Sequence, residues 1–259
     1  MSTSDNPDTD DITYRVEGAA AIITLDRPRR HNAFTFEMIA AWPEMLCRAQ
    51  ADARVSAIVL TGAGGTFCSG VDLRSLAEVD PTPLSYKEML TERIHHVALT
   101  LERLDKPVIA AMEGKAVGAG LDMALMCDMR IAGRTAEFTE GYVSIGLVPG
   151  DGGGYFLPRL VGPAKAMELL LTGDPIGAEE ALNIGMLNHL AEEGQALDRA
   201  LALVERIARH PQKAVRLIKR TVRESMHSDL PTALDLVSSH FGLVACSEET
   251  QAIIGKGRR

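Results

Sequence analysis

Apolar residues gather in three short runs in the first half of the chain, at 20–25, 55–62 and 107–112. Each run is bounded by turn residues and is too short for a helix, which is typical of a buried strand. The second and third runs each lead into a glycine-rich turn, and helical spacing follows the second of these turns at 121–127. This order of strand, turn and helix predicts an α/β fold with neighbouring parallel strands.

The same pattern predicts the remaining elements. Glu17 and Gly18 separate two strand-like runs and indicate a hairpin of 12–16 with 20–25. The segment 78–85 has the composition of a flexible linker. Helical spacing predicts helices at 34–51, at 86–104 and over most of the chain from 163 onward, with a short strand near 187–190.

The two glycine-rich turns form the first candidate site. Because the carboxyl ends of parallel strands share one edge of a sheet, the turns around Val71 and Ala119 are expected to meet there. One backbone N–H from each turn makes a two-donor hole for an oxygen that becomes negative. Asp122 lies just inside the following helix, close enough to exchange a proton with the ligand. The alternative is a tightly packed strand–helix corner in which the helix dipole favours Asp122 as a first-turn acid.

Composition bounds the class of protein. The chain has 259 residues, of which 46% are apolar, and this is enough for one large domain with a full core. Its formal net charge of -8 argues against nucleic acid as the main partner. The cysteines are widely spaced and form no C-x-x-C pair, which argues against disulfides and structural zinc: Cys47, Cys68, Cys127 and Cys246.

The N-terminal segment 1–11 is polar and acidic, so we expect a disordered tail and no signal peptide. No apolar run reaches the length that spans a membrane. Together with the unpaired cysteines, these features favour a cytoplasmic protein that binds neither membranes nor nucleic acid.

Several motifs follow one another in order from residue 22 to the C-terminal helices. They are ITLDRP at 23–28 with Asn32, FCSGVDL at 67–73, GAGLD at 118–122, GLVP at 146–149, LPR at 157–159 and LTG at 171–173. In this order and spacing they resemble the enoyl-CoA hydratase/isomerase superfamily, also called the crotonase superfamily.

The resemblance implies an α/β fold in which the ββα spiral of the crotonases covers 12–194. A C-terminal helical trimerisation region is then expected at 195–259. Members of the superfamily form homotrimers, often paired into dimers of trimers, and act on acyl-CoA thioesters. No permanently bound cofactor and no metal is implied, because coenzyme A arrives as part of the substrate.

Carried over to this chain, the oxyanion hole of the superfamily consists of the backbone N–H groups of Val71 and Ala119. The neighbouring positions are expected to bind the substrate, most of them along its pantetheine and adenine: Ser69, Gly70, Asp72, Leu73 and Gly118. Candidates for the CoA phosphates, each more commonly a solvated surface charge, are Arg29, Arg30 and Lys115.

The acid–base residues depart from the hydratase pattern. A hydratase of the superfamily holds one water between two glutamates. Here Asp122 takes the place of the first glutamate and Tyr142 that of the second, and an unperturbed phenol is a poor base near neutral pH. Standard hydration by paired glutamates is therefore not expected. Glu140 shares a face with Tyr142 in an extended segment and is the alternative if the register shifts.

Asp151 is a further candidate for catalysis. Dienoyl-CoA isomerases of the superfamily carry a reactive aspartate beside this turn and also have aspartate at the position of Asp122. In this chain Asp151 lies one residue past that place, and it also suits the cap of a helix that starts at Gly152. Both roles stay open at this point.

The sequence therefore predicts an acyl-CoA enzyme of the hydratase/isomerase type that stabilises a thioester enolate. Asp122 is the expected general acid/base, Asp151 the second candidate, and Tyr142 an orienting hydroxyl or pocket wall. Double-bond isomerisation, decarboxylation and thioester hydrolysis compete with hydration as the reaction. A non-catalytic member that only binds acyl-CoA is the alternative from another class.

Overall fold

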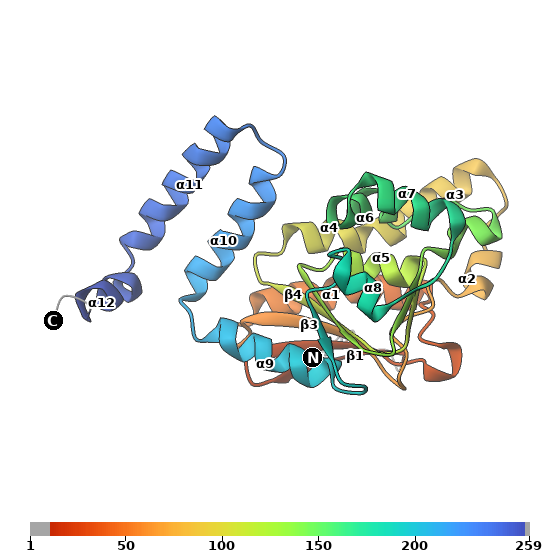
Figure 1. The fold of residues 1–259 in the computed structure, drawn as a ribbon, viewed down its shortest axis with the longest axis horizontal. Coiled ribbons are helices and arrows are strands. Elements are labelled where there is room, and N and C mark those ends of the chain that lie inside the picture. The colour runs from red at the N-terminus through yellow and green to blue at the C-terminus, as the bar shows by residue number, and fades with distance from the viewer. Residues whose placement is uncertain (1–10, 257–259) are drawn as a thin grey trace, which may run out of the picture.

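The apolar runs form the main sheet of the computed structural model, which describes residues 11–256 (Figure 1). Its strands lie in the order β1 (Ile12–Glu17), β2 (Ala20–Leu25), β3 (Ala57–Gly62), β4 (Val108–Met112), β6 (Met129–Gly133) and β9 (His189–Ala191). β1 and β2 form the predicted antiparallel hairpin, and the strands from β2 onward run parallel. A smaller sheet consists of β5 (Lys115–Val117), β7 (Glu137–Thr139) and β8 (Ile176–Gly177).

Alternate residues of the parallel strands face two separate cores. Ile23 and Leu60 belong to the larger core, which also contains the apolar faces of α1 (Phe36–Ala51), α4 (His95–Arg103) and α5 (Ala119–Leu125). Ile22 and Val59 point the other way and pack against α9 (Ala196–Ala208). Because both faces are covered, the central strands read as continuous apolar runs without polar alternation.

The other helices either connect the strands or come after the last strand in the sequence. Those that connect strands are α2 (Leu73–Ala77), α3 (Pro83–Met89), α6 (Gly153–Val161), α7 (Pro163–Thr172) and α8 (Ala178–Asn183). Those at the C-terminal end are α10 (Gln212–Ser225), α11 (Leu230–Ala245) and α12 (Glu248–Lys256). Helices α10 and α11 form an antiparallel hairpin that projects away from the sheet (Figure 1).

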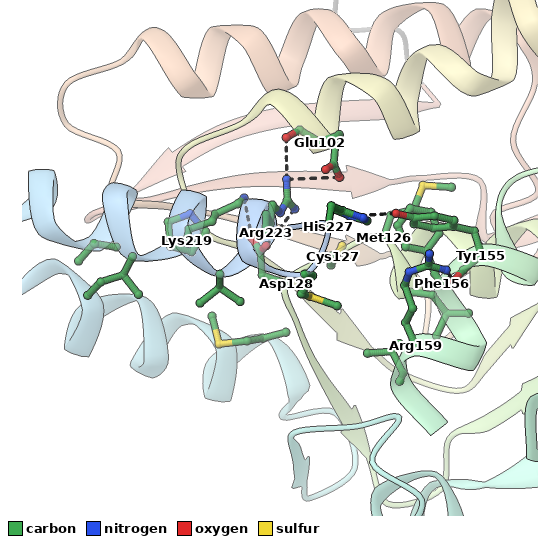
Figure 2. Close-up of a pocket in the computed structure, with 18 of the residues that line it drawn as sticks. Glu102, Met126, Cys127, Asp128, Tyr155, Phe156, Arg159, Lys219, Arg223 and His227 are labelled. Atoms are coloured by element: carbon green, nitrogen blue, oxygen red, sulfur yellow. Dashed lines mark hydrogen bonds and ion pairs between the residues drawn. The ribbon is translucent and has the colours of Figure 1, made fainter. Parts of the chain in front are cut away.

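An ion-pair network attaches α10 to the body. Asp128, just before β6, lies 2.7 Å from the Lys219 Nζ and 3.0 Å from the Arg223 Nη2 of α10. Figure 2 shows this network beside an apolar groove between α10 and the body, with Tyr155 further along the groove. Since α9 packs on the sheet, the projecting part of the chain begins with α10. The division expected at residue 194 stays a prediction.

Two details of the predicted helices are different in the structure. The expected linker 78–85 is wrong in its second part, because α3 already begins at Pro83. The Thr82 hydroxyl caps this helix by accepting a hydrogen bond from the Ser85 N–H at 3.1 Å, and proline suits the first helical position. The helix expected at 86–104 passes through a π-helical turn, Leu90–Ile94, before α4.

The expected tail 1–11 lies outside the described residues except for Asp11. The Asp11 carbonyl accepts a hydrogen bond from the Asp26 N–H at 2.8 Å, and its carboxylate pairs with Arg27 at 3.1 Å. Between residues 11 and 256, no helix has both the length and the apolar character needed to cross a bilayer.

Candidate active site

The two glycine-rich turns meet at the carboxyl edge of the main sheet, as the parallel strands predict. The Val117 N–H donates to the Cys68 carbonyl at 2.9 Å. A Cβ atom added to Gly120 would lie 2.3 Å from the same oxygen, and one added to Gly70 would lie 3.5 Å from the Ala119 nitrogen. The small residues therefore allow two backbones from distant parts of the sequence to approach each other closely.

Both predicted oxyanion donors are available. Ala119 is the first residue of α5, so its N–H has no acceptor within the helix. Phe34 pairs with the residues on either side of Val71, since its N–H donates to Gly70 and its carbonyl accepts from Asp72, both at 2.9 Å. This pairing turns the Val71 N–H toward the other side. Within residues 11–256 neither N–H donates a hydrogen bond.

Three predicted side chains converge next to these donors. Asp122 lies on the first turn of α5, Tyr142 in a short 3₁₀ helix (Gly141–Ile145), and Asp151 in the turn before α6. The Tyr142 hydroxyl lies 2.6 Å from Asp122 Oδ2 and 2.9 Å from Asp151 Oδ2. Its ring passes beside Gly118, where an added Cβ would lie 3.7 Å from the ring edge. The phenol therefore bridges the two aspartates beside the oxyanion turn.

The two contacts of the phenol require a proton on one aspartate. Tyr142 has a single hydroxyl proton and donates it fully to one carboxylate at a time. The second carboxyl keeps its short contact with the phenol oxygen if it carries a proton and donates it. A neutral carboxylic acid, a phenol and a carboxylate in sequence thus form a continuous chain of hydrogen bonds.

Burial favours this protonation. Loss of solvent is the largest cause that raises the pKa of Asp122, and the charge of Asp151 adds to it, although the Tyr142 hydroxyl lowers the pKa. Burial also raises the pKa of Asp151, whereas the Tyr142 hydroxyl and the nearby His95 lower it. Burial and both carboxylates raise the pKa of Tyr142, so the phenol stays protonated.

The capping role considered for Asp151 is wrong. Gly152 is the residue that precedes α6, and no side chain caps that helix end. The Asp151 carboxylate is directed to the Tyr142 hydroxyl instead. The turn itself is tied to α4, because His95 Nε2 lies 2.9 Å from the carbonyl oxygen of Gly150. The Asp151 carboxylate is therefore not engaged in capping the helix.

Glu140 joins the cluster together with Tyr142, but not through the shared face of an extended segment. The chain bends at Glu140 and enters the 3₁₀ helix at Gly141, so the two side chains do not follow the alternation of an extended strand. The Glu140 side chain is 2% exposed, and its carboxyl lies against that of Asp122. A bend of this kind leaves no clear signal in the sequence.

The positions expected along the substrate have mixed surroundings. The Asp72 carboxylate pairs with Arg27 at 3.0 Å and caps α2 by accepting from the Arg74 N–H at 3.0 Å, so it holds the oxyanion turn in place. Leu73 is 63% exposed, whereas the Ser69 hydroxyl donates a hydrogen bond to the Arg30 carbonyl at 3.4 Å. The binding role of both residues stays a prediction.

Other candidate groups have structural surroundings. Cys68 is fully buried, and burial raises the pKa of its thiol to about 12, so it acts as a packing residue. Lys115 pairs with Glu137 at 3.2 Å on the surface. In the part of the chain that the structure describes, no cluster of His, Cys, Asp or Glu is arranged to hold a metal ion.

Comparison with known proteins decides the family. The family model described as Enoyl-CoA hydratase/isomerase matches residues 15–258. The chain belongs to the enoyl-CoA hydratase/isomerase family. Its α/β architecture is the crotonase fold, as the motifs predicted. The chain thus belongs to a family of enzymes that act on CoA thioesters.

Similar members of the family include enzymes with different reactions. The short-chain-enoyl-CoA hydratase of Clostridium acetobutylicum is 34% identical over 92% of this chain and 90% of its own. The 1,2-epoxyphenylacetyl-CoA isomerase of Escherichia coli is 38% identical over 92% of this chain and 91% of its own. Among solved structures, Pseudomonas aeruginosa DspI has a TM-score of 0.90 at 30% identity and covers 98% of both chains. Overall identity therefore does not choose the reaction.

Proposed function

We propose that this member of the family moves a double bond along the acyl chain of a CoA thioester, converting a 3-enoyl-CoA into a 2-enoyl-CoA. The observation that carries the proposal is the position of the Tyr142 hydroxyl between Asp122 and Asp151. A hydratase of the superfamily holds its water between two glutamates, and here a phenol bridges two acids instead. Isomerisation needs a proton to leave one carbon and arrive at another, and consumes no water.

The first step removes a proton from the acyl carbon next to the thioester. Asp122 takes this proton, and the electron pair moves onto the thioester oxygen to give a dienolate. The N–H groups of Val71 and Ala119 hold that oxygen and stabilise its new charge. Ala119 is only 3% exposed, so its N–H acts with little competition from water.

The second step returns a proton two carbons further along the chain. Asp151 donates its proton to the γ-carbon, the electron pair on oxygen returns, and the double bond forms next to the thioester carbonyl. Asp122 now carries a proton and Asp151 a charge. Tyr142 restores the starting state by passing its own proton to Asp151 while it accepts the proton of Asp122, so the cycle balances.

Hydration is the second candidate, because the similar enzyme of Clostridium acetobutylicum is a short-chain-enoyl-CoA hydratase. It would need a water directed at the substrate by Asp122 and Asp151 while Tyr142 stays between them. Turnover of a 3-enoyl-CoA and of crotonyl-CoA, each followed by the absorbance of the 2-enoyl thioester, separates the two. We expect absorbance to rise with the first substrate and to stay constant with the second.

A variant strengthens this experiment. Tyr142→Glu restores a carboxylate where the hydratase pattern has one, and it should raise crotonyl-CoA hydration while isomerisation falls. Rapid hydration by the wild type would overturn the proposal. If the wild type turns over neither substrate, decarboxylation, thioester hydrolysis or binding without catalysis becomes the better account.

The assembly is also part of the proposal. We expect a homotrimer or a dimer of trimers, and what supports it is the exposed apolar surface of the C-terminal helices. In the single chain α11 has no buried residue, and Leu234 is 54% and Phe241 73% exposed. Light scattering on the purified protein tests the trimer. A cytoplasmic location is proposed as well, supported by the exposed free thiols of Cys47 and Cys246.

A further inference from the structure

Three buried oxygens of the acid cluster lack a hydrogen-bond donor if every carboxyl is ionised. They are both oxygens of Glu140 and Oδ1 of Asp122. Leaving several buried acceptors unpaired is costly, because each gave up hydrogen bonds to water on folding. One proton between the two carboxyl groups would turn their contact into a hydrogen bond.

The backbone of α6 leaves space for this contact. A Cβ atom added to Gly153 would lie 2.3 Å from Asp122 Oδ1 and 3.2 Å from Glu140 Oε1. Both carboxyl oxygens therefore occupy the space that any other residue at 153 would fill with its side chain. Glu140 is 2% and Asp122 0% exposed, so bulk solvent does not reach them.

We propose that Glu140 is a positioning residue that keeps its proton and donates it to Oδ1 of Asp122. Asp122 then accepts from Glu140 through Oδ1 and from Tyr142 through Oδ2. Two donors fix the carboxylate plane and make Asp122, not Glu140, the charged base that faces the substrate. The proton of the Asp122–Tyr142–Asp151 chain is thereby assigned to Asp151.

The charges around Glu140 support this assignment. The ionisable groups that act on it come from α5 and the turn before α6, and both are acidic: Asp122 and Asp151. Burial is the largest cause that raises the pKa of Glu140, and the charge of Asp122 raises it further. In the described part of the chain, no cation among the groups that act on Glu140 offsets them.

A stability measurement tests the bound proton without any substrate. The unfolded chain releases the Glu140 proton above about pH 4.5, whereas the folded protein keeps it, so wild-type stability should fall as pH rises above that value. The glutamine of Glu140→Gln is neutral at every pH, so the stability of this variant does not fall for this reason. We expect the unfolding constant of the wild type, relative to that of Glu140→Gln, to rise up to about tenfold per pH unit between pH 5 and 7.

The matched control is Glu193→Gln, which changes an exposed glutamate and should leave the ratio independent of pH. A pH-independent ratio for Glu140→Gln as well would overturn the inference. The stability measurement does not depend on the reaction that the enzyme catalyses.

The catalytic role rests on the proposed isomerase function and is tested separately. Glu140→Gln keeps a donor beside Asp122 and should retain kcat within about threefold, whereas Glu140→Leu removes it and should lower kcat by about tenfold or more. The acid limb of the pH–rate profile should shift only in Glu140→Leu. Equal activity and equal profiles of both variants would overturn the positioning role. If the wild type isomerises nothing, the proposed function fails while the stability arm still decides the proton.

Discussion

The Tyr142 hydroxyl lies 2.6 Å from Oδ2 of Asp122. It thus occupies the hydrogen-bonding position at which a hydratase of the superfamily would hold water. The same phenol lies 2.9 Å from Asp151, so a residue that is a poor base by itself connects two acids. The tyrosine at the position of the second glutamate therefore links three side chains by hydrogen bonds. The consequences can be measured one residue at a time.

Asp122→Asn tests the base of the proposed reaction. The amide keeps the shape of the carboxylate but cannot take a proton, so we expect kcat for 3-enoyl-CoA to fall by about 10²- to 10⁴-fold. Affinity for coenzyme A should change little, because the oxyanion donors are backbone groups. Calorimetric titration with a non-reactive acyl-CoA measures the affinity. Asp198→Asn, an exposed change on α9, is the control, and unchanged turnover by Asp122→Asn would remove this residue from the mechanism.

Gly153→Ala tests how closely α6 approaches the acid. The new methyl group would lie 2.3 Å from Asp122 Oδ1, so the carboxylate must move away from its position. A displacement of about 1 Å can cost about 10²-fold in rate, and we expect a loss of that order in kcat. Gly154→Ala is the matched control, since its Cβ would meet only Pro149 Cγ at an ordinary 3.7 Å. Equal activity of the two variants would contradict the geometry described here.

The pH dependence of the wild type follows from the raised pKa values of the aspartates. The reaction needs Asp122 ionised and Asp151 protonated, which predicts a bell-shaped profile of kcat/KM. Because burial raises the pKa of Asp122, the acid limb should lie well above the ordinary aspartate value of about 3.9. Activity is lost again where Asp151 releases its proton, and burial raises the pKa of this carboxyl as well. An acid limb near pH 4 would indicate a solvated carboxylate instead.

Stability should depend on pH with the opposite sign to that of a salt-bridged acid. A carboxyl whose pKa is raised on folding stabilises the protein most below its unfolded pKa, and this contribution is lost as pH rises through the folded value. The acid cluster therefore makes the wild type less stable at pH 7 than at pH 5. Chemical unfolding at both values measures this difference, and in Asp122→Asn the decrease should be smaller.

Asp128→Ala tests the attachment of α10. The change leaves Lys219, whose side chain is 7% exposed, without its ionic partner and removes an acceptor from the Val108 N–H. Breaking a buried pair costs about 3 to 5 kcal/mol, and partial exposure of Asp128 lowers our expectation to about 2 kcal/mol. Urea unfolding at fixed protein concentration measures the loss. Asp198→Ala should change stability by less than about 0.5 kcal/mol, and a similar value for Asp128→Ala would contradict the anchoring role.

Local sequence patterns, namely apolar runs and glycine-rich turns, predicted most of the fold. The strands and the glycine turns were readable because buried parallel strands are continuous apolar runs and because a close backbone approach requires small residues. The helix start at Pro83 was missed since the composition of 78–85 suits a loop and a capped helix equally well. Even there, Thr82 before Pro83 is a capping signal that was present in the sequence.

The sequence predicted which residues are candidates for the site but not the hydrogen bonds that connect them. Val71, Ala119, Asp122, Tyr142 and Asp151 were all named as candidates, and the structure brings them together at one edge of the sheet. The bridge through the phenol depends on three turns that are far apart in sequence, and no local pattern encodes their distance. The buried position of Glu140 depends on one bend of the backbone, which spacing alone cannot reveal.

In the proposed isomerase cycle the Tyr142 hydroxyl carries the proton between the two aspartates. The most direct test compares the isomerisation rate of 3-enoyl-CoA by the wild type with that of Tyr142→Phe, which keeps the ring beside Gly118 and removes only the hydroxyl. We predict that kcat falls by about 10²-fold or more while affinity for a non-reactive acyl-CoA is retained. A Tyr142→Phe enzyme that isomerises at the wild-type rate would contradict the relay and leave the phenol as a wall of the pocket.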